Sequence, residues 1–156
     1  MKECRAAKNH PFHLSCGAII FRKTKKGIRI LLLHRFKSGK WPYDSWHLPK
    51  GTKQSGEKNQ ETVKRECLEE TGWQVKVLKK IGSLKSTYKI DPQITAQKIT
   101  HYHSCRPIKK LNQQTGEHDE QKWVTLPKAI KLVSRFKIWE KEEEILKKFV
   151  TNKKTL

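Results

Sequence analysis

Residues 59–71 constrain this chain most, because their glutamates recur at the spacing of a helix face. Glu66, Glu69 and Glu70 stand at positions i, i+3 and i+4, so a helix would place all three carboxylates on one side. Like charges at such positions repel by about 0.2–0.5 kcal/mol per pair. The sequence therefore predicts a helix whose acidic face is either solvated or neutralised by a bound cation.

The rest of the chain makes this acidic face unusual. The 156 residues hold 35 Lys and Arg against 15 Asp and Glu, a net charge of +20. Oxygen ligands at this local density suit a small hard cation, so Mg²⁺ or Mn²⁺ is the expected partner of the carboxylates. The excess positive charge also attracts polyanions, and it does not by itself distinguish nucleotides from RNA.

Residues on both sides of the three glutamates complete a pattern with fixed spacing. Five residues separate Gly51 from Glu57, and seven separate Glu57 from Arg65. With Cys67 and Trp73 at its two apolar positions, the chain matches the Nudix signature G-x5-E-x7-R-E-U-x-E-E-x-G-U at every fixed position. The sequence therefore resembles the Nudix hydrolases, and the order of its expected strands and helices extends the resemblance over nearly the whole chain.

The resemblance implies how this signature would act on a phosphate substrate. Glu66, Glu69 and Glu70 would bind the catalytic Mg²⁺ (or Mn²⁺), with the carbonyl oxygen of Gly51 as a further ligand. The metal would neutralise charge on phosphate oxygens and lower the pKa of a bound water, which then attacks phosphorus. The site expected from the sequence is therefore a metal-dependent hydrolytic centre on a loop-helix-loop.

Two further roles follow from the same resemblance. Glu57 and Arg65 would pair and hold the loop against the helix, since a planar guanidinium can bind a carboxylate through two parallel hydrogen bonds. The general base would be one of the signature glutamates or Glu120. Glu120 belongs to an acidic segment that also contains Glu117 and Asp119, which are candidates for the same role.

Residues outside the signature bear on the choice of substrate. The turn before it is Pro-Lys-Gly with Lys50 in the middle, a variant that resembles the asymmetrical diadenosine tetraphosphatase group of the family. There Lys50 would set a positive charge beside the polyphosphate. By the same resemblance Lys98 would bind phosphate and Tyr102 would stack on adenine, and the two positions share one face of a strand. The chain departs from the group at Gln121, where a second tyrosine is common.

The apolar pattern predicts an α/β fold in one domain over residues 1–156, with flexible tails at residues 1–11 and 151–156. Asn59 is expected to cap the acidic helix, and Gly72 to end it in the left-handed conformation. The order of elements suits a mixed sheet covered by helices on both faces, the α/β/α sandwich that the resemblance also implies. Strands are expected at residues 14–21, 28–36, 73–81, 84–90, 98–108 and 121–126, a loop with a short strand at 41–51, and helical periodicity at 127–150.

The composition limits the remaining classes of protein. The four cysteines form no CxxC pair, which argues against a zinc site and indicates a reducing compartment. No apolar stretch approaches the length of about 18 residues that suggests a membrane span. We therefore expect a cytoplasmic protein without a membrane partner, and the sequence leaves its oligomeric state open.

These observations predict Mg²⁺-dependent hydrolysis of a pyrophosphate bond in a small nucleoside polyphosphate. Diadenosine tetraphosphate, cut to ATP and AMP, fits best. Two alternatives stay open. An RNA 5′-pyrophosphohydrolase or decapping enzyme is favoured by the charge of +20, although no RNA-binding module is recognisable beyond the catalytic domain. A non-catalytic module could use the same cleft to bind nucleotide or RNA.

Overall fold

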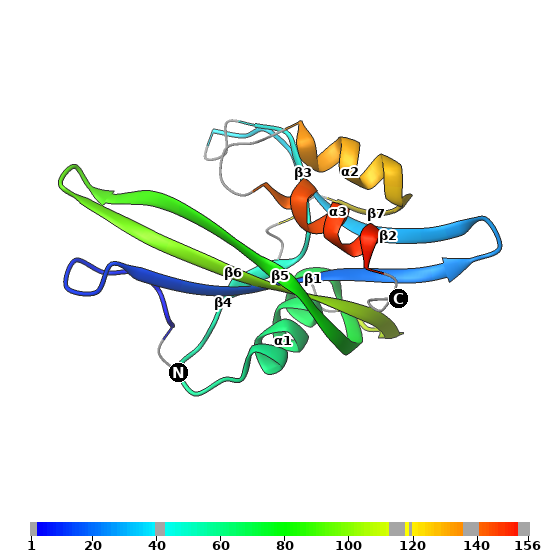
Figure 1. Cartoon of the computed structure of the whole chain (residues 1–156), viewed down its shortest axis with the longest axis horizontal. Helices are drawn as coiled ribbons and strands as arrows, with labels where there is room; N and C mark the ends of the chain where they lie inside the picture. Colours follow the sequence, from blue (N-terminus) through cyan, green and yellow to red (C-terminus); the bar gives the residue numbers. More distant parts are fainter. Residues whose placement is uncertain (1–2, 40–42, 113–117, 119, 136–140, 153–156) are drawn as a thin grey trace.

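The computed structural model describes residues 3–39, 43–112, 118, 120–135 and 141–152. Figure 1 shows α1 on one side of the sheet and α2 and α3 on the other, so the sheet lies between two helical layers, as predicted. The strands are β1 (Phe12–Thr24), β2 (Gly27–Arg35), β3 (Ser45–His47), β4 (Lys50–Thr52), β5 (Trp73–Asp91), β6 (Ile94–Lys110) and β7 (Glu120–Thr125). The helices are α1 (Asn59–Thr71), α2 (Leu126–Ser134) and α3 (Glu142–Thr151).

The central strands supply two separate apolar cores, because successive side chains of a strand point to opposite faces. Ile19 and Phe21 of β1 are buried in the core that α2 and α3 cover. Ala18 and Ile20 are buried in the other core, which α1 covers with residues such as Val63. This two-sided burial explains why β1 is an almost continuous apolar run in the sequence rather than an alternating one.

The sheet opens between β1 and β2, and the opening creates the space for a site. The two strands pair near their connecting turn, with residues 21–24 opposite residues 27–30. Farther from the turn, β4 pairs with residues 15–17 of β1 and β3 pairs with residues 33–35 of β2. Because the other edge of β1 carries β6 in parallel, β4 must lie on the β2 side. The segment between β3 and β4 is therefore held inside the opened hairpin.

The acidic helix α1 begins and ends at defined positions. Gly72 ends it in the left-handed conformation, with φ 76°, and its N–H donates to the carbonyl of Leu68 at 2.9 Å. This part of the prediction is confirmed. The cap at the start is Lys58 rather than Asn59. The Glu61 carboxylate accepts the Lys58 N–H at 2.8 Å, whereas the side chain of Asn59 accepts from Lys53.

Two other elements differ from the sequence prediction. The strands expected at residues 73–81 and 84–90 form one long strand, β5, whose pairing with β6 shifts in register between Val77 and Gly82. These irregularities accommodate Gly82, so the strand continues on both sides of it. The periodicity at residues 127–150 belongs to two helices, α2 and α3, and residues 136–140 lie outside the described part of the chain. No helix in the described residues has the length and apolarity that spanning a membrane requires.

The N-terminal segment, defined as residues 3–10, makes backbone contacts with the residues around β4 and the start of β1. The N–H of Cys4 donates to the carbonyl of Lys53 at 2.7 Å, and the N–H of Leu14 donates to the carbonyl of Cys4 at 2.9 Å. Glu3 forms a β-bridge with Gln54. The backbone groups just after β4 provide these partners, which the sequence pattern does not reveal. Of the tail expected at residues 151–156, Thr151 ends α3, and residues 153–156 lie outside the described part of the chain.

Candidate active site

Arg65 and Glu57 form a paired anchor at the start of α1. Arg65 Nε donates to Glu57 Oε1 at 2.6 Å and Nη2 donates to Oε2 at 3.0 Å, a bidentate arrangement. Glu57 also accepts from the Gln54 N–H at 2.9 Å and from the Thr62 hydroxyl at 2.7 Å. These bonds, that of Arg65 first, lower the pKa of Glu57 to about 2 although burial opposes the shift. The carboxylate therefore stays ionised and holds the loop on the helix.

The same guanidinium reaches the acidic face of α1. Its Nη1 donates to Glu66 Oε1 at 2.7 Å and to Glu69 Oε2 at 3.3 Å, while Nη2 donates to the carbonyl of Thr52 at 2.9 Å. The carboxylates of Glu57 and Glu66 raise the pKa of Arg65 above its usual value. One arginine thus connects the loop, β4 and two of the three signature glutamates.

Gly51 is required by a close approach of Glu66. A Cβ at Gly51 would overlap the carboxylate carbon and both carboxylate oxygens of Glu66. The absence of a side chain at Gly51 therefore allows Glu66 to lie directly against the backbone of β4. This contact brings the Gly51 backbone and one signature carboxylate together, as a shared cation would need.

Replacing Gly51 by alanine is expected to reduce hydrolysis much more than it reduces stability. The overlapping group is the end of a flexible side chain, so Glu66 can rotate away and the fold loses only about 1 kcal/mol. The displaced carboxylate would cost about 100-fold in rate, as misplacement by an ångström can. Hydrolysis rates and thermal unfolding measure the two effects. Gly39→Ala is the control, because nothing lies within 4 Å of a Cβ there; equal rates for the two variants would contradict the argument.

The donor set of α1 suits a hard divalent cation, although its side chains are turned to protein partners in this structure. Glu66 and Glu69 bind Arg65, and Glu70 Oε2 accepts the Lys50 N–H at 3.3 Å. Among the residues that the structure describes, no three His, Cys, Asp or Glu side chains converge on one point. Oxygen ligands and the close contact of Glu66 with Gly51 fit Mg²⁺ or Mn²⁺ chemically.

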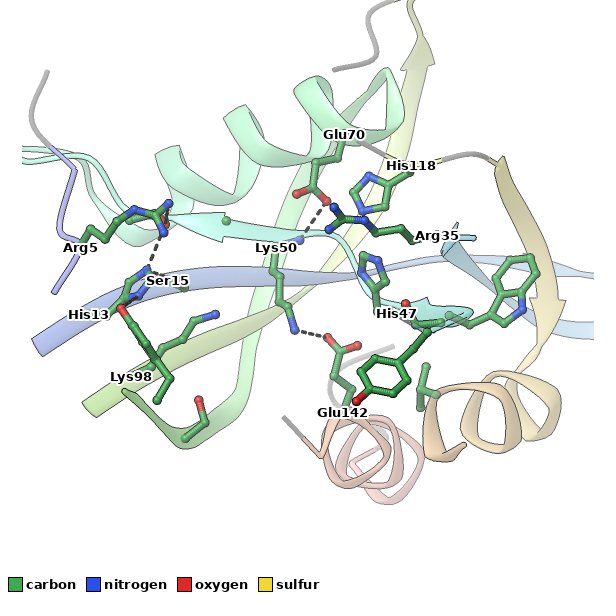
Figure 2. Close-up of a pocket in the computed structure, with 18 of the residues that line it drawn as sticks. Arg5, His13, Ser15, Arg35, His47, Lys50, Glu70, Lys98, His118 and Glu142 are labelled. Carbon is green, nitrogen blue, oxygen red and sulfur yellow. Dashed lines mark hydrogen bonds and ion pairs between the residues drawn. The ribbon is translucent and has the colours of Figure 1, made fainter. Parts of the chain in front are cut away.

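A cavity of about 490 Å³ lies beside Glu70, within the opened hairpin and between α1 and the start of α3. Glu70 and Lys50 line the middle of it, and the Lys50 side chain points toward Glu142 (Figure 2). Its described lining includes the cationic residues Arg5, Arg35, Lys50 and Lys98, the histidines His13, His47 and His118, and the aromatic residues Tyr43, Trp46 and Tyr88. A signature carboxylate thus faces a space rich in positive charge and hydrogen-bond donors.

Glu142, at the start of α3, is a buried carboxylate in this cavity and was not singled out by the sequence. It is 4% exposed. Its oxygens accept from the Leu48 N–H at 3.0 Å, from the Tyr102 hydroxyl at 2.7 Å and from Lys50 Nζ at 3.5 Å. Glu142 and Glu70 therefore hold the Leu48–Lys50 turn from two sides.

His47, which ends β3 directly before this turn, is held in its neutral form. Burial and, next, the positive charge of Lys50 lower the pKa of His47 to about 4. Its ring lies 4.7 Å from that of His118, measured between centroids. Near neutral pH His47 therefore adds a neutral imidazole, and not a charge, to the cavity wall.

The structure separates the sequence-predicted site residues into two groups. It brings Lys50, Gly51, Glu70 and Lys98 into the lining of one cavity. The second group does not line the cavity and forms the network that Arg65 organises: Glu57, Arg65, Glu66 and Glu69.

Tyr102 and Glu120 belong to neither of these groups. Tyr102 is fully buried among the apolar residues under α2 and α3, so it offers no ring face to a base. The predicted stacking of Tyr102 on adenine is therefore wrong. Glu120 lies at the start of β7, with its carboxylate 3.4 Å from His34 Nδ1 and 3.8 Å from Lys122 Nζ, and it does not line the cavity. Glu117 and Asp119 lie outside the described residues.

The cavity also contains residues that the sequence did not indicate. Arg5 and His13 come from the N-terminal segment and the start of β1, and Arg35 ends β2. None belongs to a motif, and each is one polar residue among many in a basic chain. For Glu142 a partial signal existed, because an acidic run favours the first turn of a helix.

Comparisons with known proteins agree with this geometry. A model of the NUDIX domain matches residues 11–149. Among solved structures, the Ap4A hydrolase of C. elegans in a binary complex is 22% identical, with a TM-score of 0.62 over 89% of this chain and 96% of that one. The MutT protein of Methanosarcina mazei Go1 is 24% identical, with a TM-score of 0.64 over 90% and 94%. The dihydroneopterin triphosphate pyrophosphohydrolase of E. coli is 19% identical, with a TM-score of 0.66 over 89% and 95%. At these identities the structural matches establish the shared fold.

Proposed function

Because this chain belongs to the NUDIX domain family, we propose that it is a divalent-metal-dependent pyrophosphohydrolase of nucleoside polyphosphates. The observation that carries the proposal is the cavity itself. It joins the signature carboxylate Glu70 to the cationic side chains of Arg5, Arg35, Lys50 and Lys98. Such a space suits a ligand with several negative charges that must lie beside a metal-binding carboxylate.

Glu66, Glu69 and Glu70 are the proposed metal ligands, with the Gly51 carbonyl as a further one. When bound, Mg²⁺ or Mn²⁺ supplies neutralisation of the charge that develops on phosphate oxygens. Arg65 binds Glu66 and Glu69 in the present arrangement, so its role is to hold these carboxylates on the side of α1 that faces Gly51. The donor set, and not a preformed cluster, supports this assignment.

Lys50 and Lys98 are the proposed phosphate-binding residues. Lys50 donates its backbone N–H to Glu70, so its side chain starts beside the proposed metal ligands. Tyr43 and Trp46 line the same cavity, and Tyr43 is 38% exposed. These two aromatic residues replace Tyr102 as the proposed contacts for a base. In the reaction, the oxygen of water forms a bond to one phosphorus while the bridging P–O bond breaks, and the leaving phosphate oxygen takes up a proton.

Our preferred substrate is diadenosine tetraphosphate, cut to ATP and AMP. The Pro-Lys-Gly turn with Lys50, Lys98 in the cavity, and the aromatic lining support this choice. The net charge of +20 favours RNA with a 5′-triphosphate as the second candidate, because a long RNA offers many phosphates to a basic surface.

A competition assay separates these substrates. Purified protein with Mg²⁺ receives diadenosine tetraphosphate and 5′-triphosphorylated RNA together, and the products of each are resolved by chromatography. We expect ATP and AMP to form while the RNA stays intact. Release of phosphate or pyrophosphate from RNA, with the dinucleotide unchanged, would replace our preferred substrate by the second candidate. Binding of both without turnover would indicate a non-catalytic module.

A further inference from the structure

The N-terminal segment lies outside the part of the chain that matches the family model, which begins at residue 11. Its backbone is nevertheless fixed to the residues that follow β4 and to β1, through Cys4, Lys53 and Leu14. At its far end, Lys8 Nζ lies 3.4 Å from Asp91 Oδ2 at the turn between β5 and β6. The segment thus lies before the matched residues and, through Arg5, forms part of the cavity wall.

This segment carries Arg5 to one end of the cavity. Arg5 Nη2 donates to the hydroxyl of Thr52 at 3.1 Å, and Arg5 Nε donates to Glu3 at 2.9 Å. The side chain is 58% exposed and lines the cavity beside His13 and Ser15, as Figure 2 shows. Because Thr52 follows Gly51 directly, Arg5 lies next to the first residue of the signature.

A chain of hydroxyl and imidazole groups extends from Arg5 along the same end of the cavity. His13 is buried, with Nε2 3.0 Å from the Thr52 hydroxyl and Nδ1 2.8 Å from the Tyr88 hydroxyl. The Ser15 hydroxyl also lies 3.3 Å from Nε2. With the ring proton of His13 on Nδ1, Nε2 accepts from a hydroxyl of Thr52 or Ser15, and Nδ1 donates to the Tyr88 oxygen. In that tautomer the Tyr88 hydroxyl, which lines the cavity, keeps its own hydrogen as a donor for a ligand.

Positive charge also gathers at this end. Lys98 is the register partner of His13 on the neighbouring strand β6, and it lines the cavity with Arg5. The two carboxylates of the described lining, Glu70 and Glu142, both contact Lys50 in the middle of the cavity. Two cations and a terminal hydroxyl donor are complementary to a phosphate group.

We propose that this end of the cavity is an anion subsite in which Arg5, supplied by the N-terminal segment, binds a phosphate of the substrate together with Lys98 and Tyr88. The inference rests on the proposed function and makes it more specific. A substrate held at Glu70 must have a phosphate chain long enough to reach Arg5. The segment before residue 11 therefore selects for polyphosphates over shorter phosphate compounds.

The test combines a binding probe with steady-state kinetics. Sodium tripolyphosphate is titrated into metal-free protein by calorimetry, and KM and kcat are measured with diadenosine tetraphosphate and Mg²⁺. Arg5→Gln removes the charge but leaves the backbone bonds of Cys4 and Leu14 in place, so the segment should stay ordered. Lys8→Gln is the matched control, because it removes the same charge from the same segment at a residue that does not line the cavity.

We expect Arg5→Gln to weaken tripolyphosphate binding about tenfold, as the loss of one charge-assisted hydrogen bond would. KM should rise by a similar factor with kcat within about twofold of the original, because the contact is remote from the reacting bond. Lys8→Gln should match the unaltered protein in both assays. Equal affinities for the Arg5 and Lys8 variants, or no binding by the unaltered protein, would overturn the subsite. A lack of dinucleotide hydrolysis would instead contradict the proposed function, and the tripolyphosphate titration would still decide the subsite.

Discussion

Replacing Glu70 by glutamine is expected to lower the metal-dependent hydrolysis rate by about 100- to 1,000-fold without unfolding the protein. Glu70 is the proposed metal ligand that also lines the cavity, and it is 8% exposed. Its Oε2 accepts the Lys50 N–H at 3.3 Å, and an amide oxygen can accept the same bond. The substitution therefore removes the negative charge and largely preserves the local structure.

Initial rates at increasing Mg²⁺ concentration, together with circular dichroism and thermal unfolding, measure this effect. Glu144→Gln is the matched control, because Glu144 is an exposed acid in the first turn of α3. It changes the net charge equally and should retain full activity. If Glu70→Gln kept the original rate and the original Mg²⁺ dependence, Glu70 would not be a metal ligand. If neither the original protein nor Glu70→Gln showed turnover but both bound nucleotide, the domain would be a binding module.

Replacing Glu142 by alanine is expected to lower the free energy of unfolding by about 3–5 kcal/mol. The buried carboxylate accepts from the Leu48 N–H, the Tyr102 hydroxyl and Lys50 Nζ. Alanine leaves these donors without that acceptor, and a buried donor that loses its acceptor is costly. Glutamine retains one acceptor oxygen, so Glu142→Gln should cost less, about 1–2 kcal/mol.

Urea unfolding gives these free energies, and Glu144→Ala is the control for helix propensity and for the charge at the start of α3. The control should change stability by less than about 1 kcal/mol. We also expect Glu142→Gln to raise KM, because Lys50 loses the carboxylate that orients its side chain. Equal stability of the alanine variants at positions 142 and 144 would show that the Glu142 network contributes little.

The local elements of the fold could be predicted because their causes are local. The spacing of Glu66, Glu69 and Glu70 requires a helix to bring them together, and Gly72 ends that helix in the left-handed conformation. The apolar run at residues 14–21 predicted a strand, which the structure contains within β1, buried between two cores. The pairing of Glu57 with Arg65 could also be predicted, since both belong to one motif with fixed spacing.

The composition of the cavity could not be predicted in the same way. Lys98 and Tyr102 are an even number of residues apart on β6, so they are expected on one face of the strand. Only Lys98 lines the cavity, because α3 covers Tyr102 and binds its hydroxyl through Glu142. Sequence parity gives the face of a strand but not which part of that face another element covers. This is why the role expected for Tyr102 was wrong.

The sequence by itself determined the family signature, the acidic helix, the α/β class and the excess positive charge. These depend on residue types and on short spacings along one segment. The tertiary structure alone decided which distant residues meet at Lys50. Arg5 reaches the cavity through backbone pairing after β4, and Glu142 reaches it from α3, 92 positions from Lys50 in the chain. Contacts at such separations depend on how strands and helices pack in three dimensions, and no local pattern encodes them.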